Sequence, residues 1–209
     1  MEQLSTTLRV ATIVVPVALY FLLLGLLNTR RHPQMLSARQ DFTLLLLALC
    51  PLAFQPVMLY FGGGLLTMLS CAGVMGLGVY LLSPHGKAWV IYNIPFKKGR
   101  DTIVTVLEDM GHSPIRTRRG VDVDSGLASV EIGSFPILRN ISLKLVGGDN
   151  EMWDKFENNL SARTNKIEAP PSPMAVSLLL VATLVIIAPM TLMAQHAPEI
   201  VRILTNLLP

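Results

Sequence analysis

The stretch FTLLLLALCPLAFQPVMLYFGGGLLTMLSCAGVMGLGVYLLS, residues 42–83, contains no Asp, Glu, Lys or Arg. As one α-helix it would be about 63 Å long, because a helix rises ~1.5 Å per residue. The hydrocarbon core of a bilayer is only ~30 Å thick, so one crossing would leave half of an apolar rod in water. Three glycines, 62–64, interrupt the run, and glycine tolerates the backbone angles of a tight turn. The stretch therefore predicts a hairpin of two transmembrane helices, about 42–60 and 65–83.

Two further uncharged stretches, 10–27 and 174–194, are also long enough to span a bilayer. The chain is 51% hydrophobic and 15% charged, whereas soluble domains are about 25% charged. The first stretch is too long for a cleaved signal peptide and lacks a cleavage site, so it predicts a retained anchor. The predicted fold is an α-helical polytopic membrane protein, with four transmembrane helices and a small inserted α+β domain.

The basic residues of the loops predict an orientation, since Lys and Arg gather on the cytoplasmic side of a membrane. Arg30, Arg31 and Arg39 lie between the first two spans, and four more basic residues follow the third span. We therefore expect residues 84–170 in the cytoplasm and both termini outside. This topology is typical of a bacterial inner-membrane protein, and an organelle membrane is the alternative location. The net charge of +3 is too small to predict a nucleic-acid partner.

The charged segment 84–167 predicts the cytoplasmic domain, in the order β-α-β-β-β-α. Asp101 and Asp149 are candidate N-caps of its two helices, and Gly111 is a candidate helix stop. Helices on one side of a mainly antiparallel sheet would give it a core. A proline-rich linker, 168–173, leads to the fourth span, and residues 195–209 predict an amphipathic helix on the outer surface. The predicted strands are 88–95, 114–123, 127–133 and 139–146.

The spans themselves offer few candidate sites. None of the four predicted spans contains an ionisable Asp, Glu, Lys, Arg or His, which argues against a proton or sodium path through this chain alone. Gln55 lies between Pro51 and Pro56, and it can hydrogen-bond the carbonyls that proline frees or a neighbouring helix. The third span has small residues that favour close packing, either within the hairpin or against another protein. They are Ala72, Gly73, Gly76 and Gly78.

Basic and apolar clusters outside the spans predict contacts with lipids or partners. The first basic cluster is suited to the anionic headgroups of the adjacent leaflet. The second lies on or beside a strand and is either a partner-docking edge or a solvated face. The apolar side of the C-terminal tail would lie on the membrane or in a partner's groove. The clusters are Lys87, Lys97, Lys98 and Arg100; then Arg116, Arg118 and Arg119; and in the tail Ile200, Val201, Leu204, Leu207 and Leu208.

Motifs for catalysis or cofactors are missing from the sequence. Cys50 and Cys71 fall inside spans without metal-ligand spacing, and packing is the expected role for both. Haem ligation by His32 and His85 is a cofactor alternative, and solvated histidines at the interface are favoured over it. Asp122 and Asp124 lack the other ligands of a calcium loop. The prediction is no catalytic residue, no metal and no cofactor.

Three classes of function are compatible with these features. The favoured class is a non-catalytic accessory or scaffold subunit of a larger inner-membrane complex for energy transduction or transport. Its spans would contact other membrane subunits, and its cytoplasmic domain would dock a protein partner. The alternative is a transporter or channel component that forms its path as a homo-oligomer, using Gln55 and Ser70. A lipid-modifying enzyme would need His85, Lys87 or Asp101 as its catalytic group.

Overall fold

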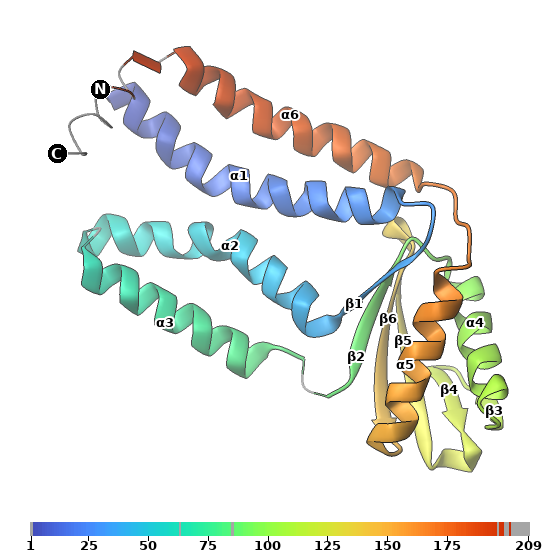
Figure 1. Cartoon of the computed structure of the whole chain (residues 1–209). Helices are drawn as coiled ribbons and strands as arrows, with labels where there is room; N and C mark the ends of the chain where they lie inside the picture. The colour runs from blue at the N-terminus through green and yellow to red at the C-terminus, as the bar shows by residue number, and fades with distance from the viewer. Residues whose placement is uncertain (1, 63, 85, 196, 199–200, 202–209) are drawn as a thin grey trace.

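Four long helices extend to one side of a small sheet in the computed structural model, which describes residues 2–62, 64–84, 86–195, 197–198 and 201 (Figure 1). Each is long and apolar enough to cross a membrane, and the four predicted spans are confirmed in that sense. The ends of α1 and α6 farthest from the sheet lie side by side. The helices are α1 (Glu2–Thr29), α2 (Ala38–Phe61), α3 (Leu65–Leu82) and α6 (Pro173–Gln195).

Helix α2 begins four residues before the predicted start at 42, because Ser37 caps it. The Ser37 hydroxyl accepts a hydrogen bond from the Gln40 N–H at 3.2 Å, and the Gln40 side chain accepts one from the Ser37 N–H at 3.3 Å. This reciprocal pair satisfies two N–H groups that have no partner within the helix. At the other end Gly62, with φ +81°, opens the turn to α3.

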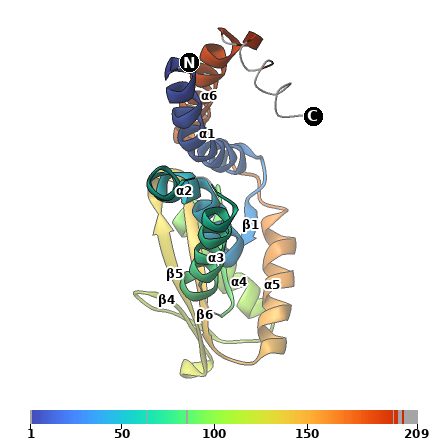
Figure 2. The same ribbon diagram turned by 90° about the vertical axis from the view of Figure 1, so that its left-hand side faces the viewer.

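The closest helix packing lies between α1 and α6, which run antiparallel (Figures 1 and 2). A Cβ added at Gly25 would lie 2.6 Å from Cγ of Leu179, so the helices touch where a side chain is missing. Small buried residues recur every seven positions on both helices, which is the spacing of an antiparallel knobs-into-holes seam. They are Ala11, Ala18 and Gly25 on α1, and Ala175, Ala182 and Pro189 on α6.

Six antiparallel strands form the sheet, in the order β1-β2-β6-β5-β4-β3. The predicted order β-α-β-β-β-α is wrong at two places. The predicted strand 114–123 is a hairpin, because the chain turns at residues 117–119. The domain also extends beyond 84–167, because β1 comes from the loop between α1 and α2. The strands are β1 (Gln34–Ser37), β2 (Ala88–Tyr92), β3 (Pro114–Arg116), β4 (Gly120–Val123), β5 (Ala128–Phe135) and β6 (Asn140–Gly147).

Two helices, α4 (Phe96–Asp109) and α5 (Asn150–Thr164), cover one face of the sheet and enclose the core. Asp149 caps α5 as predicted, and Gly111, with φ +85°, follows the last turn of α4. Asp101 does not cap α4, because the helix already begins after Pro95. Fully buried core residues include Ile91, Ile103, Leu107, Val130, Ile141, Leu143, Phe156 and Leu160.

The opposite face of the sheet, here called the open face, points to the side from which α2 and α3 extend (Figure 1). Figure 2 looks from that side and shows β4 and β5 reaching beyond α2 and α3. Strand pairing places Glu131 opposite Lys144, and Ser129 opposite Val146, on this face. If the spans stand across a bilayer, the open face is turned toward the membrane surface. The open face comprises Ile115, Asp122, Ser129, Glu131, Lys144 and Val146.

Buried amides join the membrane helices to the sheet domain. The Asn93 N–H donates to Oδ1 of Asn28 at 3.0 Å, and the Asn28 amide donates to the Leu24 carbonyl at 2.8 Å. The proline-rich linker is fixed to the same place, since the Ala169 N–H donates to the Arg31 carbonyl at 2.8 Å. Because Asn28 and Asn93 are both fully buried, the junction depends on these bonds.

Candidate functional site

A cavity of about 440 Å³ lies where α1 and α2 meet the sheet, and we call it the junction cavity. Helix α1 contributes Tyr20 and Leu24 to its wall, α2 contributes Asp41, and the remainder comes from β2, β5, β6 and the turn between the last two. The cavity is therefore bordered by both the membrane helices and the sheet domain. The sheet residues that line it are Val90, Tyr92, Gly133, Ser134, Phe135, Leu138, Asn140, Ile141 and Ser142.

Tyr92 and Asp41 form the polar wall of the junction cavity. The Tyr92 hydroxyl donates to Oδ1 of Asp41, and the tyrosine is almost fully buried. Burial raises the pKa of Tyr92 strongly, and the hydrogen bond to Asp41 raises it further, so the phenol keeps its proton. Asp41 lies in the first turn of α2, where the helix dipole favours a negative charge. Among the ion pairs of the described residues none includes Asp41.

Asn140 lines the same wall, but its amide oxygen is buried away from the cavity surface. The residue is 9% exposed, and its Oδ1 has no hydrogen-bond partner in the described part of the chain. A buried carbonyl oxygen without a donor costs about 1–3 kcal/mol. The junction cavity therefore combines the Asp41–Tyr92 pair with a largely apolar wall.

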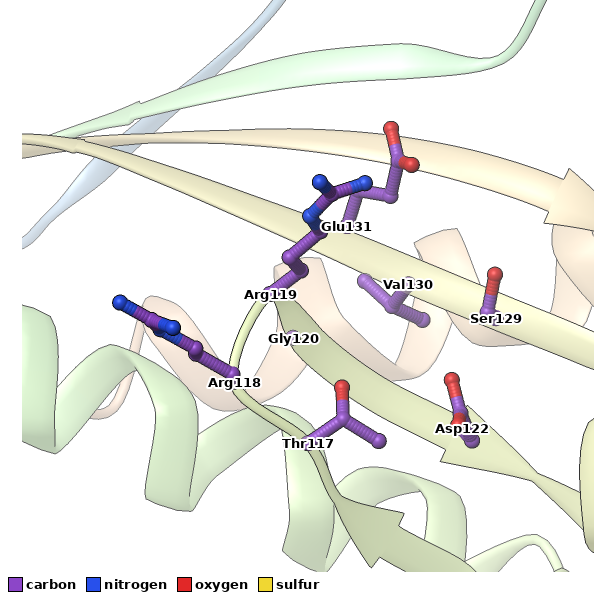
Figure 3. A pocket seen from close by; sticks show the side chains of 8 residues that line it. All are labelled: Thr117, Arg118, Arg119, Gly120, Asp122, Ser129, Val130 and Glu131. Atoms are coloured by element: carbon purple, nitrogen blue, oxygen red, sulfur yellow. The ribbon is translucent and has the colours of Figure 1, made fainter.

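A second pocket, of about 830 Å³, lies on the open face beside the turn between β3 and β4 (Figure 3). Arg119 points toward Glu131 on β5, whereas Arg118 points away from the other labelled side chains. Both arginines are exposed. Since Asp122 and Glu131 balance the two positive charges, the pocket is not a simple anion site. Thr117, Gly120, Ser129 and Val130 complete its lining.

The remaining predicted basic residues are engaged within the domain. Arg100 donates to the Thr117 carbonyl at 2.7 Å and to the Gly120 carbonyl at 3.3 Å, so it fastens the β3–β4 turn to α4. Lys87 pairs with Asp154, Arg116 pairs with Asp101 at 2.9 Å, and Lys98 donates to the Glu168 carbonyl at 3.2 Å. Lys97 is exposed. Contact of these residues with lipid stays a prediction.

The predicted small residues of α3 fall on two sides of the helix. Gly78 faces α2, where its added Cβ would lie 3.8 Å from Leu46. Ala72, Gly73 and Gly76 are exposed, and an added Cβ at either glycine meets nothing within 4 Å. We call these three residues the small-residue surface. Hairpin packing therefore uses Gly78 and leaves the small-residue surface without a partner in the described chain.

Gln55 contacts the neighbouring helix α1. Its amide donates to the Arg9 carbonyl of α1 at 3.3 Å. Nδ1 of His32, one of the two histidines considered as haem ligands, lies 3.2 Å from the Ile167 carbonyl oxygen. The other, His85, lies outside the described residues. Within the described residues no three His, Cys, Asp or Glu side chains gather as metal ligands.

The amphipathic tail falls mostly outside the described residues. Only Val201 among its predicted contact residues is described, and it is exposed. The outer-surface helix 195–209 and its lipid or partner contact stay predictions. Ile200, Leu204, Leu207 and Leu208 lie outside the described residues.

No protein-family model matches this chain, and neither a curated protein nor a solved structure matches it. Function is therefore argued from the residues alone. Sequence reasoning missed the junction cavity, because Tyr20, Asp41, Tyr92 and Asn140 come from four elements far apart in the chain. One signal was available: Asp41 is the acidic residue that immediately precedes a charge-free run.

Proposed function

We propose that this chain is a non-catalytic accessory subunit of a larger inner-membrane complex for energy transduction or transport, with its sheet domain in the cytoplasm. The small-residue surface of α3 carries this proposal. Gly73 and Gly76 leave open space where the described chain has no neighbour. In membranes, such surfaces let another helix approach closely. Within the chain, α1 and α6 approach each other closely in the same way, at Gly25.

The open face supports a second contact, with a protein outside the bilayer. Ile115 and Val146 are exposed on it, and Leu127, at its rim, is 78% exposed. These apolar side chains belong to the sheet domain and have no covering element among the described residues. Apolar side chains rimmed by polar groups are typical of interaction sites. The pocket with Arg118 and Arg119 lies beside them and offers charges of both signs for pairing.

The transporter alternative requires a polar path through the spans. Gln55, the strongest polar candidate for that path, is bonded to the backbone of α1. This contact favours a structural role for Gln55 and therefore favours the accessory reading over the transporter.

The proposal is tested by mild detergent extraction with an affinity tag on the N-terminus, followed by native mass spectrometry. The variant Gly76→Leu fills the small-residue surface, and Val74→Leu enlarges an exposed residue of α3 outside that surface. We expect larger membrane subunits to co-purify in stoichiometric amounts with the unaltered chain and with Val74→Leu. They should be lost with Gly76→Leu, because the added side chain prevents close helix approach.

Two outcomes would contradict the accessory role. One is a clean homo-oligomer or a monomer from the unaltered chain, which would favour a transporter component. The other is full retention of the partner subunits by Gly76→Leu, which would remove the small-residue surface from the contact.

A further inference from the structure

A groove between α4 and α5 collects the lysines that the sheet domain leaves without a carboxylate partner. We propose that this groove, here called the basic groove, docks an acidic segment of a protein on the same side of the membrane as the sheet domain. It lies on the opposite side of the sheet from the open face, so it is a separate surface (Figure 1). The proposal does not depend on the accessory role, because it concerns the sheet domain in any assembly.

Two adjoining hollows, of about 440 Å³ and about 640 Å³, form the basic groove. Arg163 and Ile167, at the end of α5, line both hollows. Helix α4 lines the groove from Lys97 to Asp109, a length of about 18 Å at ~1.5 Å per residue. That length matches about five residues of an extended peptide, which rises ~3.3 Å per residue. The groove can therefore hold a short segment of another chain.

The lysines of this chain fall into two sets of three. One set pairs with carboxylates of the sheet domain, and it comprises Lys87, Lys144 and Lys155. The other set makes no ion pair among the described residues and lines the basic groove, and it comprises Lys97, Lys98 and Lys166. Lys98 donates to the Glu168 carbonyl at 3.2 Å, but a backbone carbonyl carries no net charge. The unpaired lysines are therefore confined to one surface.

The carboxylates of the basic groove already have partners. Asp101 pairs with Arg116 at 2.9 Å, and Asp109 pairs with Arg163. The three lysine charges are therefore left uncompensated. Two of these lysines also lie in the first turn of α4, which has no acidic residue and where the helix dipole disfavours a cation. A carboxylate brought by a partner would offset both unfavourable terms.

The spacing and the position of the lysines favour an acidic peptide over other anions. Lys97 and Lys98 line one hollow and Lys166 lines the other, so the charges are spread along the groove instead of converging on one phosphate. The helices of the groove cover the face of the sheet that is turned away from the spans (Figure 1). If the spans stand across a bilayer, the sheet lies between the groove and the lipid headgroups. Complementary charges of this kind determine which partner docks and in which register.

The experiment measures peptide binding by the full chain in detergent. The probes are a fluorescein-labelled oligoglutamate peptide and an oligoglutamine peptide of the same length, and fluorescence anisotropy gives the Kd of each. We expect the oligoglutamate peptide to bind and the oligoglutamine peptide to remain unbound. Binding should weaken as the ionic strength rises from about 50 mM to about 300 mM, because salt screens exposed charges.

Charge reversals locate the site. Lys97→Glu and Lys166→Glu change exposed side chains in the two hollows of the groove. Each should weaken binding of the oligoglutamate peptide by about fivefold, because one screened charge pair is lost and a repulsion is added. Arg118→Glu makes the same change in net charge at an exposed residue beside the open face. It should leave binding nearly unchanged.

The proposal is overturned if Lys97→Glu and Lys166→Glu bind the peptide as tightly as the unaltered chain, or if Arg118→Glu causes the larger loss. It is also overturned if the two lysine reversals spare peptide binding and instead reduce retention of phosphatidylglycerol in native mass spectrometry, because the lysines would then bind headgroups. Both tryptophans, Trp89 and Trp153, lie in the sheet domain, so their fluorescence reports whether a variant is folded. If one lysine reversal does not fold, the other decides.

Discussion

At the scale of single residues, a few polar side chains position the domain against the membrane helices. Asn28 uses both atoms of its amide, donating to its own helix and accepting from the Asn93 N–H. Asn93 has φ 57°, a left-handed conformation that asparagine tolerates better than most residues. Its amide donates to the Arg30 carbonyl at 2.9 Å. The two asparagines therefore set the direction in which β2 leaves the junction.

Asn28→Ala should loosen this junction. The change leaves the buried Asn93 N–H without an acceptor, at a cost of about 1–3 kcal/mol. Hydrogen–deuterium exchange of the full chain should rise at residues 91–95 and at the linker 168–173, while exchange in α5 stays unchanged. Unaltered exchange at Asn93 would show that another group accepts its hydrogen bond.

Asp124 makes the stability of the β3–β4 hairpin dependent on pH. The Ser113 N–H donates to Asp124 Oδ1 at 2.9 Å, and His112 Nδ1 lies 2.6 Å from Oδ2. These two bonds lower the pKa of Asp124 below its ordinary value of 3.8. The stabilisation is therefore complete above pH 3.8 and is lost as pH falls through the lower value of the folded state.

The variant Asp124→Asn tests this dependence. Thermal unfolding followed by tryptophan fluorescence should give a lower Tm for Asp124→Asn than for the unaltered chain at pH 6, since asparagine offers one neutral acceptor. The difference should shrink at pH 3. A constant difference at both pH values would assign the effect to packing instead of charge.

At the scale of elements, space between backbones decides which pairs form. The turn between β3 and β4 brings Gly120 so close to β5 that an added Cβ would lie 1.9 Å from the Val130 carbonyl oxygen. At Gly133, on the same sheet, the one tight contact of an added Cβ would be with the Ser142 hydroxyl, at 2.4 Å, which can rotate away. The sequence pattern places both glycines in strands without separating these two cases.

Gly120→Ala should therefore destabilise the sheet domain, and Gly133→Ala should have a smaller effect. Forcing a methyl group against a backbone atom costs about 1–3 kcal/mol or more. Urea unfolding of the full chain in detergent, followed by tryptophan fluorescence, should separate the two variants. Equal midpoints would mean that β4 shifts away from β5 without loss.

Helices α1 and α6 provide the corresponding case inside the membrane. Gly25→Val would force a branched side chain into Leu179, whereas Gly73→Val enters open space on α3. We expect Gly25→Val to lower the thermal midpoint of the helical circular dichroism signal, with a cost of about 1–3 kcal/mol, and Gly73→Val to leave it nearly unchanged. The reverse ranking would place the critical helix contact on α3.

At the scale of the whole molecule, the spans were predictable and the way they join the domain was not. Long charge-free runs exclude most alternatives to a membrane helix, so the boundaries of α3 agree within one residue. Strand β1 is four residues long and depends on β2 for its pairing, so no local periodicity reveals it. The junction cavity depends on that same long-range contact. Ser37 and Gln40 were a readable capping signal for the start of α2.

The orientation predicted from the charged loops can be checked with introduced cysteines. In a background with Cys50 and Cys71 replaced by alanine, Leu127→Cys lies on the sheet domain and Leu65→Cys lies at the far tip of the hairpin. A membrane-impermeant maleimide should label Leu65→Cys on intact cells and Leu127→Cys only after the cells are opened. The opposite pattern would invert the topology.

The edge strand β1 also constrains how the protein is made. Its partner β2 begins at Ala88, and residues 38–87, which contain both helices of the hairpin, are synthesised in between. At ~5–20 residues per second this interval lasts roughly 3–10 s. Throughout that time the N–H and C=O groups of β1 have no strand to pair with, because β2 does not yet exist. This edge of the sheet can therefore close only after the whole hairpin has been synthesised.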